Sequence, residues 1–148
     1  MSLSNDFKEF IKCLNSAKVE YLLVGGHALA IHGLPRFTKD IDFWVSVDST
    51  NAKRIINALN QFGMGDVGLK ESDFLQLGKI IQLGIPPNRI DIITSVDGLS
   101  FENAFLKRMM TTYRDIPLPV ICKEDLIINK QSTGRDQDAL DAKKLAKL

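Results

Sequence analysis

The sequence has little cysteine, little net charge and no long apolar run. Of its 148 residues only Cys13 and Cys122 are cysteines, and their wide separation favours free thiols over a disulfide or a metal site. The formal net charge of +1 gives no general signal for binding a polyanion. Because no run approaches membrane-spanning length and the N-terminus lacks the basic-then-apolar order of a secretory signal, we expect a cytoplasmic protein with no membrane partner.

Length and composition predict one domain over residues 1–148. A chain of this size with 45% hydrophobic residues can bury a proper core but is too short for two comfortable domains. The sequence contains no internal repeat, linker or low-complexity segment. Helices and strands can therefore be assigned along one continuous unit.

Hydrophobic periodicity predicts an α/β or α+β fold, with a small mixed sheet and flanking helices that lie mainly on one side. Residues 109–121 are extended but too rich in proline for a central strand, and residues 74–85 form either one bent strand or a hairpin broken at Gly78. Asp48 is suited to cap the third helix and Asp136 the last, whose leucines 140, 145 and 148 form its apolar side. The expected helices are 4–17, 27–32, 49–62, 101–108, 123–131 and 136–148, and the expected strands are 19–24, 40–47 and 89–96.

The stretch from Tyr21 to Val47 carries the features that suggest chemistry. An apolar strand ends in Gly25-Gly26, directly before a short helix. Missing side chains let a ligand approach the backbone, and the amides of a first helical turn favour anionic groups such as phosphate. A glycine pair also occurs in many ordinary turns, so this feature alone does not define a site.

Two carboxylates follow on the next strand. Asp40 and Asp42 are two residues apart and share one face of a strand, while Ile41 and Phe43 point to the other face. Such a pair either lies in water at a strand start or binds a hard cation such as Mg²⁺. Asp91 is the single acidic residue of the strand 89–96, and it would join the pair if the two strands were neighbours.

The remaining polar residues have structural alternatives. His27 and His32 lack the spacing of a zinc site and are more typical of packed or solvent-facing histidines. Arg36 could steer a phosphate or pair with an acidic residue. Helix capping and a salt bridge explain Asp136 and Asp138 as well as an active-site role does.

The segment VGGHALAIHGLPRFTKDIDFWV, together with Asp91 in RIDII, resembles the nucleotidyltransferase superfamily related to DNA polymerase beta. It is more closely similar to the small bacterial AbiEii-type toxins of type IV toxin–antitoxin systems. Those proteins share a glycine pair at a helix start, an Asp-x-Asp strand, a third Asp on a neighbouring strand and a late helical segment with Lys, Arg and Asp. Here the late segment contains Lys130, Arg135, Asp136 and Asp138.

The resemblance implies a two-metal site. Asp40, Asp42 and Asp91 would hold two Mg²⁺ ions, and Asp91 could also take the acceptor proton. Gly25 and Gly26 would present backbone amides to the triphosphate. Many superfamily members have Gly-Ser at this step, whereas this chain has two glycines and therefore no serine hydroxyl for the phosphate.

Two basic residues complete the implied site. Lys130 and Arg135 would meet phosphate charge, since an ammonium and a guanidinium both suit it. The implied function is Mg²⁺-dependent transfer of a nucleotidyl group from a nucleoside triphosphate to a hydroxyl of RNA (such as tRNA), a protein or a small molecule, with a toxin role beside an antitoxin partner left open. The alternative is a catalytically idle domain that binds a nucleotide or a partner protein.

Overall fold

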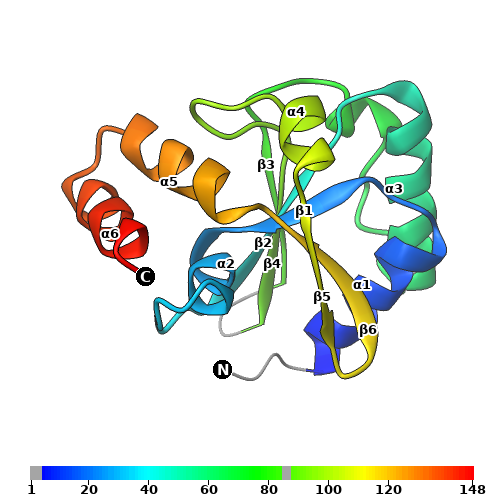
Figure 1. The fold of residues 1–148 in the computed structure, drawn as a ribbon. Helices are drawn as coiled ribbons and strands as arrows, with labels where there is room; N and C mark the ends of the chain where they lie inside the picture. The colour runs from blue at the N-terminus through cyan, green and yellow to red at the C-terminus, as the bar shows by residue number, and fades with distance from the viewer. Residues whose placement is uncertain (1–4, 85–87) are drawn as a thin grey trace.

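A computed structural model describes residues 5–84 and 88–148, and it contains one six-stranded mixed sheet. The strand order is β3-β4-β2-β1-β6-β5, and β2 lies between a parallel neighbour, β4, and an antiparallel one, β1. Figure 1 shows the strands crossing the middle of the molecule. The strands are β1 (Tyr21–Val24), β2 (Asp40–Val45), β3 (Ile80–Leu83), β4 (Arg89–Ile93), β5 (Met109–Tyr113) and β6 (Ile116–Val120).

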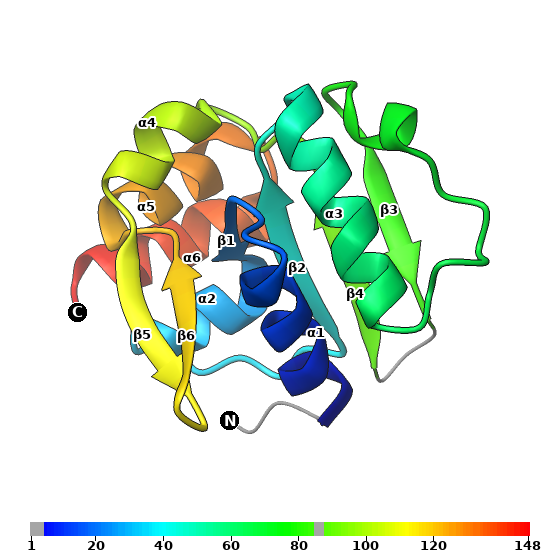
Figure 2. The same ribbon diagram turned by 90° about the vertical axis from the view of Figure 1, so that its right-hand side faces the viewer.

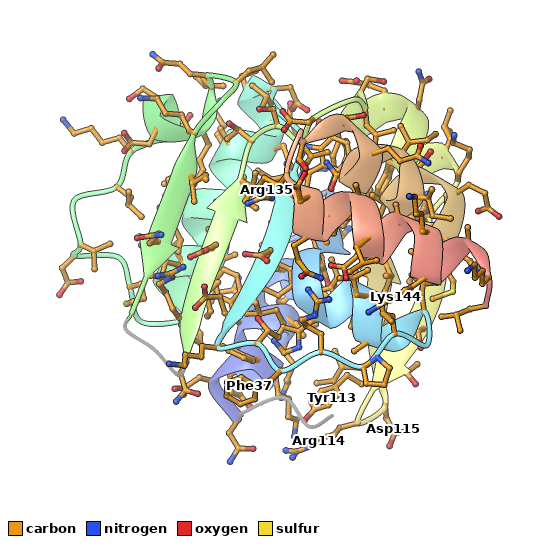
Figure 3. The ribbon with its side chains drawn as sticks, turned by 90° about the vertical axis from the view of Figure 1, so that its left-hand side faces the viewer. Phe37, Tyr113, Arg114, Asp115, Arg135 and Lys144 are labelled. Carbon is orange, nitrogen blue, oxygen red and sulfur yellow. The ribbon has the colours of Figure 1, made fainter. Side chains whose placement is uncertain are left out.

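Helices cover both faces of the sheet, so the expectation of helices mainly on one side is wrong. Helices α1 and α3 lie over one face (Figure 2), and α2, α5 and α6 lie over the other (Figure 3). On that second face the strands β3, β4 and β2 have no helix in front of them (Figure 3). The helices are α1 (Asn5–Ser16), α2 (Gly25–Ile31), α3 (Ser49–Gln61), α4 (Phe101–Leu106), α5 (Lys123–Ser132) and α6 (Asp136–Ala146).

The core occupies both faces of the sheet: its buried residues come from α1 and α3 on one face and from α2, α5 and α6 on the other. Ile41 and Phe43 are fully buried, and the ring of Phe43 lies 5.5 Å from that of Phe10 in α1. The alternation expected from the sequence is therefore present, with apolar side chains on the face opposite Asp40 and Asp42. Burying such residues is the main favourable contribution to the stability of a domain this size.

The turn into α3 is fixed by polar contacts. The Asp48 carboxylate accepts a hydrogen bond of 2.8 Å from the Asn51 amide, which confirms the predicted helix cap. The Asn51 side chain is buried and bonds both backbone groups of Glu20 as well as the Ser46 carbonyl. This asparagine therefore ties the start of β1 to the end of β2.

Strand β6 contradicts the expectation that its prolines exclude an inner position, because it lies between β1 and β5. Its contact with β1 is short: one register pair joins Leu23 to Val120, and the Ile121 amide donates to the Leu23 carbonyl. Successive amides of a strand point to opposite sides, so alternate residues point the same way. Since the Ile121 amide points to β1, positions 117 and 119 also face β1, and the prolines there lack N–H groups only on that side. The remaining amides of β6 are free to pair with β5.

Two other expectations need correction. The described part of the segment, residues 74–84, forms neither a bent strand nor a hairpin: a 3-10 turn, η1 (Glu71–Phe74), precedes Gly78 and the single strand β3. In α6, Arg135 occupies the N-cap without a side-chain capping hydrogen bond, and Asp136 is the first helical residue. Leu140 is 46% exposed and only Leu145 is buried in the core, because the helix turns its acidic residues inward.

The limits of the described chain leave some expectations aside. The start of the first helix, expected at residue 4, and the end of the segment expected over residues 74–85 lie outside the described residues. Among the helices of the described ranges, none is both long and apolar enough to cross a membrane.

Candidate active site

The parallel pairing of β2 with β4 places the three carboxylates on one face of two neighbouring strands. Asp42 is the register partner of Asp91, and Asp40 is the register partner of Arg89. Register partners and residues two apart in a strand share a face of the sheet, so all four side chains lie on the face that carries Asp42. On this open face no described helix lies in front of β4 (Figure 3), although α2 begins beside β2 and Asp91 itself is buried.

The Asp42 carboxyl is poised to hold a proton near neutral pH. Burial, followed by the charges of Asp91 and Asp40 and a hydrogen bond with Asp91, raises the pKa of Asp42 to about 7, while Arg89 partly opposes the rise. A carboxylate among like charges favours its neutral form because ionisation adds repulsion to desolvation. The pair Asp42 and Asp91 is therefore destabilised when both are ionised and no cation is present.

Gly25 is required by Asp42 itself. At Gly25 the backbone has φ +74°, and a Cβ there would lie 2.1 Å from Oδ2 of Asp42. At Gly26 a Cβ would lie 3.1 Å from the Cβ of Thr38, a tight contact but no overlap. The first glycine thus lets α2 begin directly against the carboxylate, in a conformation that other residues rarely adopt.

Arg89 is the site residue that the sequence reasoning missed. Its guanidinium bonds Asp40 through Nη2 at 2.5 Å and Asp91 through Nε at 2.9 Å and Nη2 at 3.2 Å. A signal was present, because Arg89 and Asp91 are two apart on one strand and must share a face. Nothing in the sequence alone placed Asp40 opposite Arg89.

The expected phosphate ligands Lys130 and Arg135 meet at a carboxylate. Lys130 Nζ lies 3.2 Å from Asp138 Oδ1, and Arg135 Nε lies 2.7 Å from Oδ2, which also accepts from Thr133 at 2.7 Å. Burial would raise the pKa of Asp138, but the hydrogen bond from Thr133 and the two cations hold it below its ordinary value. Asp138 is thus an ionised hub between α5 and α6.

The two cations of this hub differ in exposure. The Lys130 side chain is 12% exposed and that of Arg135 is 73% exposed. Figure 3 shows Arg135 at the start of α6, on the side of the molecule that carries the open face of β2 and β4. Arg135 is therefore accessible to a ligand while Lys130 is enclosed.

Arg36 pairs with an acidic residue far away in the sequence. Its Nη2 lies 2.5 Å from Oδ1 of Asp141, a fully buried carboxylate in α6 that also accepts from Gln137 at 3.0 Å. The connection before β2 is thereby fastened to the last helix. Of the two readings that the sequence left open for Arg36, pairing with an acidic residue is present.

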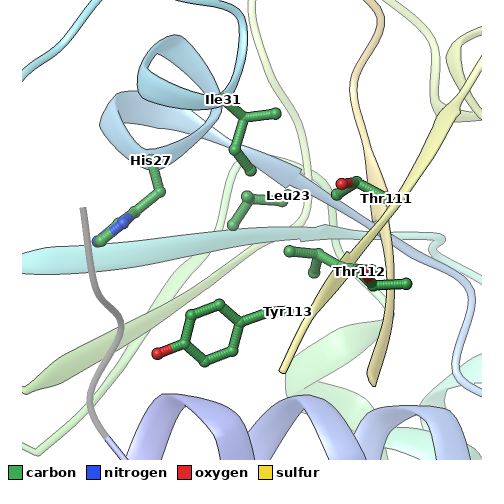
Figure 4. A pocket seen from close by; sticks show the side chains of 7 residues that line it. Leu23, His27, Ile31, Thr111, Thr112 and Tyr113 are labelled. Carbon is green, nitrogen blue, oxygen red and sulfur yellow. The ribbon is translucent and has the colours of Figure 1, made fainter. Parts of the chain in front are cut away.

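The histidines have packing roles. His27 is buried beside the ring of Phe7 at 5.8 Å, and burial lowers its pKa. Together with Leu23, Ile31 and Tyr113 it lines a small pocket between α2 and the β5–β6 hairpin (Figure 4). His32 contacts the Ile121 carbonyl through Nε2 at 2.8 Å.

The three carboxylates do not form a preformed metal site. Within residues 5–84 and 88–148, no three His, Cys, Asp or Glu side chains are grouped so that they could hold an ion. Oδ1 of Asp40 is nevertheless buried and has no hydrogen-bond partner in this part of the chain. Both cysteines are free thiols.

Comparison with known proteins agrees with this fold. A solved structure titled "Crystal structure of lincosamide antibiotic adenylyltransferase LnuA, lincomycin-bound" superposes with a TM-score of 0.53 at 19% sequence identity, over 99% of this chain and 98% of that one. No curated protein matches the chain. The model of one family, described as "Nucleotidyltransferase of unknown function (DUF6036)", matches residues 1–146. The chain therefore belongs to this nucleotidyltransferase family, which confirms the superfamily expected from the sequence.

Proposed function

We propose that the chain transfers a nucleotidyl group from a nucleoside triphosphate to an acceptor hydroxyl, with Asp40, Asp42 and Asp91 as ligands of a divalent metal pair. The observation that carries the proposal is the register of β2 and β4, which sets Asp42 beside Asp91 with Asp40 on the same open face. Membership in a nucleotidyltransferase family supports the type of reaction.

The residues fit Mg²⁺ by their chemistry. They offer hard carboxylate oxygens, which this ion prefers, and one of them, Oδ1 of Asp40, is buried without a hydrogen-bond partner among the described residues. Bound Mg²⁺ would neutralise the triphosphate and polarise its phosphoryl oxygens. In the proposal Asp91 also accepts the proton of the acceptor hydroxyl.

The triphosphate would be met by backbone and by cations. The Gly25-Gly26 start of α2 adjoins Asp42, so its amides are near the carboxylates, and the exposed Arg135 can offer its planar fork to phosphate oxygens. Lys130 contributes indirectly in this proposal, because it is enclosed and paired with Asp138.

For the acceptor we favour a small hydroxylated molecule. The superposed structure is named an antibiotic adenylyltransferase bound to lincomycin, and it matches this chain over almost its whole length. An RNA (tRNA) or protein acceptor, a toxin role and an antitoxin partner are supported by the AbiEii-type resemblance alone. The cytoplasmic location stays a prediction from the sequence.

A catalytically idle domain of the same fold is the second candidate. The observation that favours it is the ion pairing of Arg89 with Asp40 and Asp91, which neutralises part of the charge that would attract metal. Such a domain would bind a nucleotide or a partner protein without turnover.

Pyrophosphate release separates the two candidates. The full chain is incubated with each labelled triphosphate, Mg²⁺ and, in separate reactions, hydroxylated small molecules, total RNA or protein extract. The Asp91→Asn variant is expected to bind the triphosphate several-fold more weakly and to release no pyrophosphate, because a ligand that acts in the transition state affects turnover more than binding. The control is Asp66→Asn, at an exposed carboxylate of a surface loop.

Either of two results would contradict the enzyme. Wild-type protein that releases no pyrophosphate with any triphosphate and any acceptor leaves the idle domain as the better account. An Asp91→Asn variant with wild-type turnover would remove Asp91 from the active site.

A further inference from the structure

Arg89 occupies the position of a cation at the carboxylate site. Within residues 5–84 and 88–148 it is the only Lys or Arg side chain in an ion pair with Asp40 or Asp91. It is the first residue of β4, and the parallel register sets it directly opposite Asp40. The guanidinium is therefore held by the same backbone pairing that assembles the acidic residues.

The contacts of Arg89 use the oxygens that a metal would need. Three oxygens of Asp40 and Asp91 accept from its Nη2 and Nε at 2.5 to 3.2 Å. A magnesium ion binds carboxylate oxygen at about 2.0–2.1 Å, so an ion on these oxygens would lie within a few ångströms of the guanidinium. Two cations at that distance repel each other strongly in a partly buried site.

We propose that Arg89 is an exchangeable counter-cation: a divalent metal binds Asp40 and Asp91 by displacing its guanidinium, and Arg89 thereby sets the metal affinity of the site. The inference rests on the proposed function for the presence of a metal. The side chain is 25% exposed, so it can leave toward solvent without moving the buried residues of the sheet.

The exchange gives the metal-free protein a stable form. Three carboxylates on one face repel one another, and Arg89 pairs with two of them, while Asp42 forms no ion pair with a described residue. A forked guanidinium matches two carboxylates better than an ammonium would, because it offers several donors in fixed directions. The metal must then compete with a ligand that the fold itself supplies.

The experiment measures metal binding without turnover. Full-length wild-type protein and Arg89→Gln, both freed of metal with chelator, are titrated with Mg²⁺ and Mn²⁺ by calorimetry and by the metal-induced rise in melting temperature. We expect Arg89→Gln to bind the metal at least about tenfold more tightly than wild type. A tenfold change corresponds to the free energy of about one hydrogen bond to a charged group, which in the variant no longer competes with the metal. Unchanged or weaker binding overturns the exchange.

A matched control separates direct competition from a general loss of positive charge. Lys39 is exposed and adjacent to Asp40 in the sequence, so Lys39→Gln removes one charge nearby without touching the ion pairs. Its metal affinity should stay near that of wild type. Equal tightening in Lys39→Gln and Arg89→Gln would assign the effect to net charge and overturn the inference.

A second measurement needs no substitution that could unfold the chain. The Nε–H resonance of Arg89, followed by NMR in wild-type protein, should shift and exchange faster with water as Mg²⁺ saturates the site. A resonance that stays unchanged at saturation overturns the exchange. Arg89→Lys, which keeps the charge and loses the fork, should bind metal with an affinity between those of wild type and Arg89→Gln.

The outcomes also separate this inference from the proposed function. Wild-type protein that turns over while Arg89→Gln binds metal no more tightly leaves the enzyme intact and removes only the exchange. Wild-type protein that releases no pyrophosphate, together with tighter metal binding by Arg89→Gln, supports the exchange and removes the enzyme. If neither protein binds metal, both fail.

Discussion

The raised pKa of Asp42 predicts how the free energy of unfolding changes with pH. In the metal-free fold burial and the neighbouring charges of Asp91 and Asp40 raise the pKa of Asp42 from 3.8 to about 7. An asparagine in its place cannot ionise, but its amide can still donate a hydrogen bond toward Asp91. We therefore predict that Asp42→Asn leaves metal-free stability almost unchanged in acid and increases it relative to wild type at neutral pH.

The sign and size follow from proton linkage. Below the unfolded pKa of 3.8 both states of wild-type protein carry the Asp42 proton, so its contribution to stability is fully present. As the pH rises toward the folded pKa of about 7, the unfolded state loses the proton first and the native state is destabilised relative to it. A rise of about three pKa units corresponds to an upper limit of about 4 kcal/mol. The loss is complete above about pH 7.

The assay is urea unfolding of wild type and Asp42→Asn in chelator, at pH steps from about 4.5 to 8.5. The difference in free energy of unfolding cancels every group that titrates alike in both proteins, so its pH dependence reports Asp42. A difference that varies by less than about 1 kcal/mol over this range would refute the reasoning. In a parallel series Mg²⁺ should stabilise wild type more than the variant, and an equal response would count against Asp42 as a metal ligand.

Two further predictions concern how the site is built. Gly25→Ala should destabilise the chain by at least about 1–2 kcal/mol and weaken its stabilisation by Mg²⁺, because residue 25 has a positive φ and an added Cβ would overlap Asp42. Gly26→Ala is the control, since a Cβ there makes only a tight contact with Thr38. Equal effects of the two substitutions in thermal melts would argue against this role of Gly25. Arg36→Met should cost roughly 3–5 kcal/mol, because it leaves the buried Asp141 without its cation. Adding Asp141→Leu should recover part of that loss in urea unfolding, and purely additive losses would show that the pair is not coupled.

Local patterns predicted most of the elements and the face that carries the acidic residues. The alternation around Ile41 and Phe43 indicated which side of the strand is buried, and Asp48 indicated where α3 begins. These features depend on residues a few positions apart, where strand geometry and capping chemistry act directly. The sequence could state only conditionally that Asp91 joins the pair, since strand order is set by long-range packing.

The features that could not be predicted all depend on contacts between distant segments. Strand β6 can lie inside the sheet because its two proline nitrogens, which carry no hydrogen, face the short contact with β1. No local pattern reveals which strand becomes its neighbour. Leu140 looked like part of an apolar helix face, but α6 buries Asp138 and Asp141 instead. That choice is stable only because Arg36, Lys130 and Arg135, which come from other elements or turns, reach those carboxylates.

The ion pairs at Asp138 determine which basic residue near the C-terminus is available to a ligand. A buried carboxylate is tolerated only with partners, because desolvation of an unpaired charge is costly. Lys130, which is enclosed, cannot leave Asp138 without exposing it to that cost, whereas the largely exposed Arg135 can turn away while Thr133 and Lys130 still hold the carboxylate. Within the proposed function, Lys130 therefore stabilises the fold, and Arg135 is the cation of this hub that could bind a phosphate.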